Sequence, residues 1–545
     1  MKGDVAKLTA KPQRADRALC LIGIVALLFE CPVAAAGPLD LDPTFNKGSG
    51  KVVTSFQLHP EALAVALQKK DGKIIAVGHA DNGDPTGEDF ALVRYNPDGS
   101  IDKAFGTDNN GRVSTDFGLE DSAYGVVIQP DGKIVVAGDV VDLDVIDPYA
   151  PKSGDFALAR YNSDGTLDTS FGKSGRVQTD FGAYESATGL ALLQDGKIVV
   201  VGQQQPNGND SNFLIARYMP NGDQDINFGD AGKVIEDFGA WDRALAVAIQ
   251  NDSKIVVVGS TWGPNFQPVY GALARYHPEG TLDGSFDYGL GYFCAFVHSC
   301  GKVKVSLGGG FYDYPVSLAL RNADGTEDGK IVVAGPFGLA RFNANGTLDE
   351  YFGNAGIMDN QDNTGNAVAI LGNNHIVVAG MHSDDFAVAI YEPTGEQCSG
   401  EASVTTDFNG HASHANAMAI DSNGKILLVG GADNGTDTYS DFALARYEGG
   451  DCPPTRWLGF YAAYNPFVHP QDLVGPPVPP EGPYNQLAIG SSQQLAIPAS
   501  NGDAFAGPKR PGYQAFELTN AARESGKRFV GRSDQRRGRL IARSP

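Results

Sequence analysis

The fold of this chain is decided by the stretch Asp131-Gly-Lys-Ile-Val-Val-Ala-Gly138 and by Phe156-Ala-Leu-Ala-Arg-Tyr161, which follows it. Variants of both recur about 60 residues apart between Lys51 and Tyr447, in seven copies. Repeats of that length, each reading as several short strands, are typical of radial or solenoid β architecture, because one unit cannot bury its own apolar face. The sequence therefore predicts an all-β repeat protein.

Four strands are expected in each copy, and in the first copy they span 62–68, 73–80, 90–96 and 112–117. The first strand alternates small and larger apolar residues, whereas the second is apolar on both faces, as a strand sandwiched between neighbouring sheets would be. Asp-Gly and Asn-Gly dipeptides, which suit two-residue hairpins, join the first strand to the second. We predict a seven-bladed β-propeller of four-stranded antiparallel blades over residues 37–452, a blade number within the usual range.

The repeat region begins with a segment that could serve as the missing fourth strand of its last copy. The chain enters with a segment that resembles a fourth strand, Lys51-Val-Val-Thr-Ser-Phe56, and leaves after a third strand, Phe442 to Tyr447. Pairing these segments would cover two bare sheet edges, which otherwise favour aggregation. We therefore expect the N-terminal strand to complete the last blade and close the ring.

An arginine near the end of the third strand is followed eight residues later by an aspartate in most copies. The pairs are Arg94 and Asp102, Arg160 and Asp168, Arg217 and Asp225, Arg275 and Asp283, and Arg341 and Asp349. The last copy has Arg446 without a following aspartate, and Asp42 at the N-terminus supplies one; the sixth copy has Ile390 and lacks both. This pattern predicts a repeated charge-assisted pair that fixes the loop between third and fourth strands.

These motifs, with Asn96 to Gly106 and Asn162 to Gly172, resemble the delta-60 repeat family of exported bacterial β-propellers. The resemblance covers almost all of residues 41–447 and implies the propeller fold and export. It implies no agreed biochemical activity, so any function must be argued from the residues themselves.

The segments outside the repeats read as targeting and linker sequence. Residues 1–36 combine basic residues, a short apolar run and Ala34-Ala35-Ala36, which is typical of a cleaved secretory signal peptide. We therefore expect a secreted, periplasmic or cell-surface protein, and no stretch is apolar for long enough to be a transmembrane segment. Residues 453–508 read as a Pro-rich linker and polar segment, and 509–545 as a basic disordered tail.

The net charge bears on which partners the protein could bind, and the cysteine count bears on disulfides. The formal net charge is −23, and because both ends are net basic, the propeller region is more acidic than the whole chain. We expect no nucleic acid partner, and we expect a monomer. Four cysteines follow the signal peptide, Cys294, Cys300, Cys398 and Cys452, which suggests disulfides with three connectivities open.

The predicted blade has two unlike faces. Loops joining strands one to two and three to four repeat regularly, whereas those joining two to three and four to one vary in length and chemistry, as binding loops do. Aromatic and acidic residues stand side by side in these variable loops, a combination that suits sugar rings and their hydroxyls. The candidate ligand-binding residues are Asp121, Tyr124, Tyr184, Glu185, Trp241, Asp242, Trp262, Tyr312 and Asp313. The structural alternative is that these rings pack onto the blade tops.

No catalytic or metal-binding motif is recognisable. His411 and His414 lack the helix and the acidic third ligand of a metalloprotease site, so we interpret them as a solvent-exposed pair. Acidic loops such as the one containing Asp139 and Asp142 leave calcium as the one cofactor to consider, although none has the twelve-residue calcium loop. We therefore expect no cofactor, with calcium possible, and a non-enzymatic binding or scaffold module for glycan or protein ligands. The alternative is an exported propeller lyase, hydrolase or quinone-dependent sugar oxidoreductase acting at the central mouth.

Overall fold

The computed structural model describes part of the chain. The described residues are 37–81, 83, 87–142, 153–206, 210–239, 241–263, 269–286, 301–308, 314–323, 326–359, 364–398, 403–433, 435, 440–450 and 452. They all belong to the first of two compact units, Met1–Tyr461, whereas the second is Ala462–Pro545. The predicted signal peptide, linker and basic tail lie outside the described residues, as do Cys294 and Cys300.

The described secondary structure is almost entirely β, apart from the short 3-10 helix η1 (Asn46–Gly48). The first four-stranded set is β2 (Leu58–Leu67), β3 (Ile74–Asp81), β4 (Glu88–Tyr95) and β5 (Arg112–Thr115). The second is β6 (Glu120–Ile128), β7 (Ile134–Val141), β8 (Gly154–Tyr161) and β9 (Arg176–Thr179). The third is β10 (Tyr184–Leu192), β11 (Ile198–Gln205), β12 (Asn212–Tyr218) and β13 (Lys233–Glu236), joined to the second by one parallel bridge between Tyr184 and Gly154.

The remaining strands repeat the same antiparallel order. One sheet is β14 (Trp241–Ile249), β15 (Ile255–Trp262), β16 (Val269–Tyr276) and β17 (Lys302–Val305). The next is β18 (Ser317–Ala323), β19 (Thr326–Gly335), β20 (Gly338–Phe342) and β21 (Ile357–Asp359), followed by β22 (Thr364–Ile370), β23 (Ile376–His382), β24 (Asp385–Tyr391) and β25 (Ser403–Thr406). The last sheet is β26 (Ser413–Ile420), β27 (Ile426–Asp433) and β28 (Ser440–Tyr447), with β1 (Lys51–Thr54) at its edge.

The pairing of β1 with β28 confirms the expectation that an N-terminal strand completes the sheet of the last repeat. The two strands are antiparallel, with Lys51 opposite Ala445 and Thr54 opposite Phe442. A segment near the start of the chain therefore completes a sheet formed by its last repeat, and the bare edge of β28 is covered.

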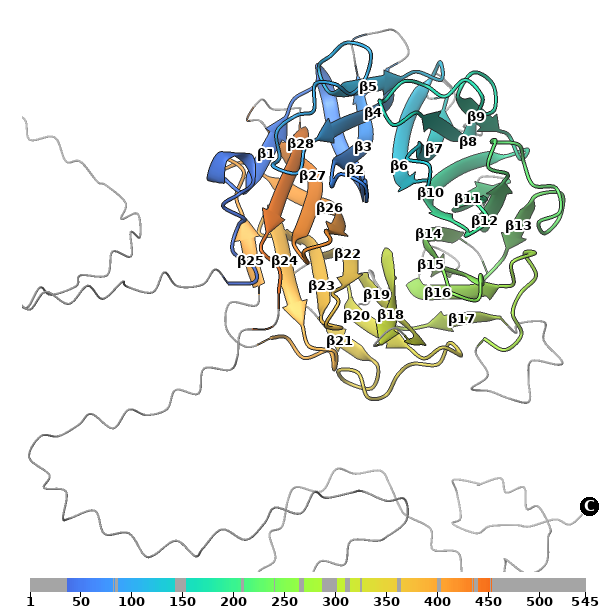
Figure 1. Cartoon of the computed structure of the whole chain (residues 1–545). Coiled ribbons are helices and arrows are strands. Elements are labelled where there is room, and N and C mark those ends of the chain that lie inside the picture. The colour runs from blue at the N-terminus through green and yellow to red at the C-terminus, as the bar shows by residue number, and fades with distance from the viewer. Residues whose placement is uncertain are drawn as a thin grey trace, which may run out of the picture. The chain divides into compact units, whose positions relative to one another are not determined.

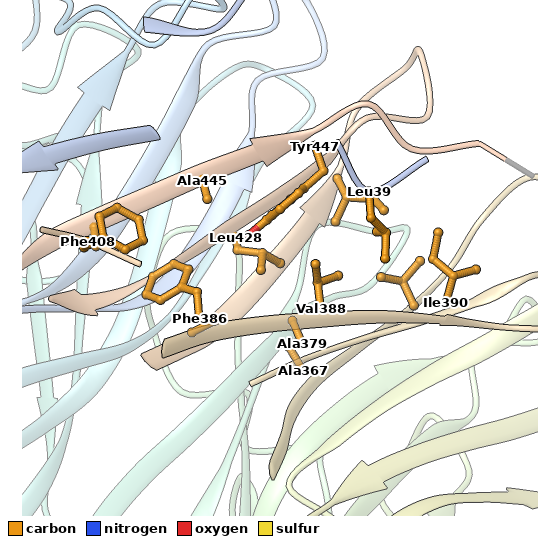
Figure 2. Packing of buried hydrophobic residues seen from close by; sticks show 14 of the residues in the cluster. Leu39, Ala367, Ala379, Phe386, Val388, Ile390, Phe408, Leu428, Ala445 and Tyr447 are labelled. Carbon is orange, nitrogen blue, oxygen red and sulfur yellow. The ribbon is translucent and has the colours of Figure 1, made fainter. Parts of the chain in front are cut away.

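Buried apolar clusters hold neighbouring sheets together. The second strands supply residues to both sides, as predicted: Ile198, Val199, Val200 and Val201 of β11 are all fully buried. One cluster packs the first sheet against the last, through Ile74 and Ala76 of β3 and Leu427 and Val429 of β27. Another joins β24 to the last sheet, and Figure 2 shows Phe386, Val388 and Ile390 beside Leu428, Ala445 and Tyr447. Figure 1 shows the sheets following one another about a common centre, with β2, β6, β10, β14, β18, β22 and β26 innermost.

A bulge in the innermost strands explains the glycine that ends the second-strand motif. The register of β6 against β7 shifts between Ala123 and Gly125, and the corresponding shift recurs in five other sheets. A Cβ atom at Gly138 would stand 1.8 Å from the carbonyl oxygen of Ser122, so no other residue fits opposite the bulge.

Candidate functional site

The predicted arginine–aspartate pairs form on one face of the sheets, and we call each one a clasp. In six clasps an arginine nitrogen lies 2.6–2.8 Å from an aspartate oxygen, and a lysine from the start of the second strand lies 2.5–3.3 Å from the same aspartate. The arginine also stacks on a phenylalanine of the same loop, as Arg94 does on Phe105 with 4.5 Å from Cζ to the ring centroid. The prediction of a structural ion pair is confirmed for these positions.

Each clasp reaches the next sheet as well. The Arg94 guanidinium donates to the carbonyl oxygen of Ser163 in the following repeat, and the other five arginines make the equivalent bond. Arg446, paired with Asp42, donates to Pro97 of the first sheet, so this clasp joins both ends of the repeat region. Because these charged residues recur in the same geometry, their repetition on this face is explained by a role in stabilising the fold.

Two pockets on the clasp face follow from this repetition. One of about 580 Å³ is lined by Lys254 and Arg275, and another of about 590 Å³ by Lys197 and Arg217, the equivalent clasp residues of two neighbouring repeats. Because both are spaces between adjacent turns of the same kind, they give no reason to assign a ligand to this face.

A pocket of about 560 Å³ on the opposite face has a different lining. It collects residues from the first strands of three successive sheets, including Ser122 and Tyr124 of β6, Tyr184 and Ser186 of β10, and Arg243 of β14. The ends of the second strands add further polar groups, including Asp81, Asp139 and Gln203, and His59, Glu88 and Glu120 complete one side. This is the face on which the sequence predicted binding.

Strand alternation separates the aromatic and acidic residues that the sequence places side by side. Tyr124 and Tyr184 line the pocket, whereas Asp121, Glu185 and Asp242 are completely buried. These buried carboxylates accept backbone N–H bonds from the turn before each strand: Asp121 from Phe117 at 2.5 Å, Glu185 from Phe181 at 3.1 Å and Asp242 from Phe238 at 2.5 Å. Successive residues of a strand point to opposite faces, so the tyrosines and the acids have different surroundings.

The other candidates lie elsewhere. Trp241 and Trp262 are direct cross-strand partners on β14 and β15, both half-buried and neither part of the pocket lining. Tyr312 and Asp313 lie outside the described residues. His414 stands within β26, where its Nε2 lies 2.8 Å from Oε1 of Glu61, whereas His411 precedes that strand.

Two carboxyl groups of the pocket have raised pKa values. Burial, together with the charges of Glu120, Glu61 and Asp81, raises the pKa of Glu88 to about 7. Burial raises the pKa of Asp139 to about 6, although a hydrogen bond with Ser186 and the charge of Arg243 act in the opposite direction. Both groups therefore titrate near neutral pH in a concave site, a combination common at functional sites.

Glu88 lies close to the carboxylate of Glu120 and to His79. Its N–H donates to Oε2 of Glu120 at 3.0 Å, and its Oε2 lies 3.8 Å from Nε2 of His79. Gly87 has a φ of 90°, and a Cβ atom there would lie 2.3 Å from the Glu120 carboxylate. The positive φ favours glycine at this position, and the backbone here brings Glu88 and Glu120 next to each other.

Sequence reasoning missed Ser122, Ser186 and Arg243, although a signal for them exists. Each directly precedes the alanine at the bulge of its strand, where the other sheets place Glu61 and His414. The neighbouring positions repeat as small residues, while this position changes from serine to arginine, glutamate and histidine. A position that varies inside an otherwise regular repeat marks residues that the architecture does not require.

A comparison with protein-family models supports a β-propeller repeat. A family model described as "Domain of unknown function (DUF5122) beta-propeller" matches residues 69–105, 129–146, 152–171, 193–228, 250–286, 326–352 and 422–449. These matches cover less than half of the chain and fall on every copy of the repeat except the sixth, which supports a β-propeller fold. The delta-60 name remains a resemblance. A search of curated proteins gave no match.

Solved structures of similar fold have very different sequences. The chain is similar to a protein of unknown function from Dyadobacter fermentans DSM 18053, with 11% identity, 73% of this chain and 97% of that chain covered, and a TM-score of 0.37. It is also similar to a calcium-binding protein, regucalcin, from Agrobacterium tumefaciens str. C58 (12% identity, 61% and 92% covered, TM-score 0.32). A third is an acylaminoacyl peptidase from Pyrococcus horikoshii (12% identity, 72% and 53% covered, TM-score 0.37). These likenesses carry no argument about the activity or ligand of this chain.

Among the described residues, no helix is both long and apolar enough to cross a membrane.

Proposed function

We propose that this chain is an exported binding protein whose pocket between β6, β10 and β14 takes a glycan with neutral or amino-sugar units. The observation that carries the proposal is the convergence of Tyr124 and Tyr184 with Ser122, Ser186 and Arg243 in one pocket. Aromatic rings can cover the apolar face of a sugar while such polar groups bond its hydroxyls.

The charge of the pocket limits the kind of sugar. Four acidic residues, Asp81, Glu88, Glu120 and Asp139, share the lining with Arg243 and His59. An anionic sugar would be repelled by this excess of acids, whereas an amino sugar would be attracted. We therefore expect uronic and sialic acids to be poor ligands.

The proposal takes the sheets as the blades of one closed seven-bladed ring. Its support is the pairing of β1 with β28, the buried cluster between first and last sheets, and the clasp between Arg446 and Pro97. A closed ring would fix neighbouring innermost strands relative to one another, so a pocket formed by three of them would be preformed.

A glycan array tests the proposal directly. The purified mature protein should bind neutral or amino-sugar glycans, and Tyr124→Ala and Tyr184→Ala should each lose that binding. Tyr351→Ala is the matched control, because Tyr351 is 90% exposed in a loop between third and fourth strands, on the clasp face. Binding that survives both pocket variants would contradict the site, and a folded protein that is silent on the array would favour a protein ligand.

A second candidate function is acid–base chemistry on the same glycan. It is favoured by the raised pKa values of Glu88 and Asp139, because a general acid or base works best when its pKa lies near the working pH. Incubating an array ligand with the protein and analysing products by mass spectrometry tests it. Turnover that Glu88→Gln abolishes without loss of binding would establish an enzyme, whereas an unchanged ligand would support binding alone.

A further inference from the structure

Three carboxylates meet where the first sheet joins the second, away from the lining of the sugar pocket. Asp89 lies at the start of β4, Asp116 follows β5, and Asp121 lies at the start of β6. Each offers a carboxylate oxygen, and these three oxygens lie within 4.8 Å of one another. Asp89 and Asp121 are buried, whereas Asp116 is exposed, so the group has one side open to solvent.

Asp121 is the observation that distinguishes this group from an ordinary acidic surface cluster. Its side chain is completely buried, and Oδ2 accepts the Phe117 N–H at 2.5 Å. Its Oδ1 is also buried and has no hydrogen-bond partner among the residues that the structure describes. A buried carboxylate oxygen without a donor costs free energy, so this atom would gain from a cation beside it.

The electrostatics agree with that reading. The buried Asp121 carboxyl group lies beside two other acids, Asp89 and Asp116. Three neighbouring acids at neutral pH repel one another unless a positive charge lies among them. A bound cation would offset this repulsion.

We propose that Asp89, Asp116 and Asp121 bind a hard divalent cation, with calcium the expected ion. Oxygen-only ligands suit calcium, which takes six to eight of them, and water can reach the open side at Asp116 to complete the shell. The ion would join the third and fourth strands of one sheet to the first strand of the next. It is a different site from the sugar pocket and does not depend on the proposed function.

The next junction offers a natural control. Asp155, Asp180 and Glu185 form the equivalent group, also with oxygens within 4.8 Å of one another. There, however, Oε2 of Glu185 accepts from Phe181 at 3.1 Å, and Oε1 accepts from Ala183 at 2.9 Å and from Gln204 at 3.2 Å. Because hydrogen bonds already satisfy Glu185, we expect this second group to bind calcium much more weakly.

Calorimetric titration of calcium chloride into the full mature protein, first stripped with EDTA, tests the proposal. We expect saturable binding that Asp116→Asn weakens by about tenfold or more, because one of three charged ligands is lost. Asp116 is exposed, so this variant should fold, and far-UV circular dichroism checks it. Asp180→Asn, the equivalent change at the control group, should leave the affinity within about twofold.

A second readout separates a bound ion from a nonspecific effect of salt. Calcium should raise the melting temperature of the wild type and of Asp180→Asn, but not of Asp121→Asn, whose amide can still accept the Phe117 N–H. No calcium binding by the wild type would overturn the proposal. Equal affinities of Asp116→Asn and the wild type would also overturn it, as would a loss confined to Asp180→Asn.

Discussion

The two faces of the sheets use charged residues in opposite ways. On the clasp face, arginine, lysine and aspartate repeat in the same geometry and are satisfied by one another, as in Arg94 and Lys73 around Asp102. On the pocket face, Glu88 and Asp139 are held near other acids or in buried surroundings, with raised pKa values. Charges of the first kind satisfy one another across the repeats, whereas those of the second kind line a pocket.

The sixth repeat is the exception on the clasp face. Ile390 replaces the arginine, Cys398 stands where the aspartate would be, and Cys398 is disulfide-bonded to Cys452 after the last strand. Figure 2 shows Ile390 among apolar side chains that include Leu39 and Val388. A covalent bond and an apolar contact therefore replace the ion pair between the sixth and seventh repeats, and no part of the family match covers residues 353–421.

The largest loss of stability is expected when the chain ends are separated. Deleting residues 37–56 removes β1, Asp42 and Phe45, which bares the edge of β28 and leaves Arg446 without its acid. We expect the truncated protein not to fold, or to melt far below the intact protein, when unfolding is followed by circular dichroism. A truncated protein that melts like the full one would refute closure by the N-terminal strand.

Removing a single clasp should also cost a large part of the stability. Asp42→Asn leaves Arg446 and Lys425 without a buried counter-charge, so we expect a loss of about 3–5 kcal/mol in urea unfolding. Asp108→Asn, an exposed change in a loop of the same face, should stay within about 0.5 kcal/mol. Equal effects of the two variants would mean that the clasp does not hold the ends.

The same clasps predict a pH dependence. Although burial raises it, hydrogen bonds from Lys425 and Thr44 and the charge of Arg446 hold the pKa of Asp42 well below its usual range. A carboxyl group with a lowered pKa contributes stability above its unfolded-state pKa of about 4, and that stability is lost as the pH falls through the folded-state pKa. Below about pH 4 the wild type should therefore lose stability more steeply than Asp42→Asn, as urea titrations at several pH values would show.

Loss of the disulfide should cost less than loss of closure. Cys398 and Cys452 are 54 residues apart, so the Cys398→Ala, Cys452→Ala variant should lose about 2–4 kcal/mol in urea unfolding. If instead the double variant unfolds like the wild type, the apolar cluster around Ile390 is sufficient at this junction.

Rebuilding a clasp in the sixth repeat would sharpen the comparison. In a Cys452→Ala background, Ile390→Arg should destabilise by burying an unpaired charge, and adding Cys398→Asp should recover part of the loss. We expect a favourable coupling of about 1–3 kcal/mol between the two changes in a double-mutant cycle. Strictly additive effects would show that the local backbone no longer supports the pair.

The smallest effect on stability belongs to the pocket. Tyr184→Ala removes a partly exposed ring that the clasps do not contact, so we expect a change of about 1 kcal/mol or less in urea unfolding. A much larger loss would mean that the tyrosine serves packing, the structural alternative that the sequence left open.

The features that could be predicted from the sequence were those that recur in each copy of the repeat. The strands, the pairing of Lys51–Thr54 with the last strand and the Arg446–Asp42 clasp follow from comparing copies within the chain. The pocket does not, because its residues come from three sheets and their directions depend on strand alternation and on the bulge after Ser122, Ser186 and Arg243. Alternation also explains why Asp121 and Tyr124, which are three residues apart in the sequence, have unrelated surroundings.

The measurement that tests the account most directly compares the pocket with the tryptophan pair. A glycan selected on the array is titrated calorimetrically into the wild type, Tyr184→Ala and Trp262→Ala. We predict at least about tenfold weaker binding for Tyr184→Ala and a change within about twofold for Trp262→Ala, because only Tyr184 lines the pocket. Weaker binding by Trp262→Ala with unchanged binding by Tyr184→Ala would contradict the account and place the ligand on the tryptophans.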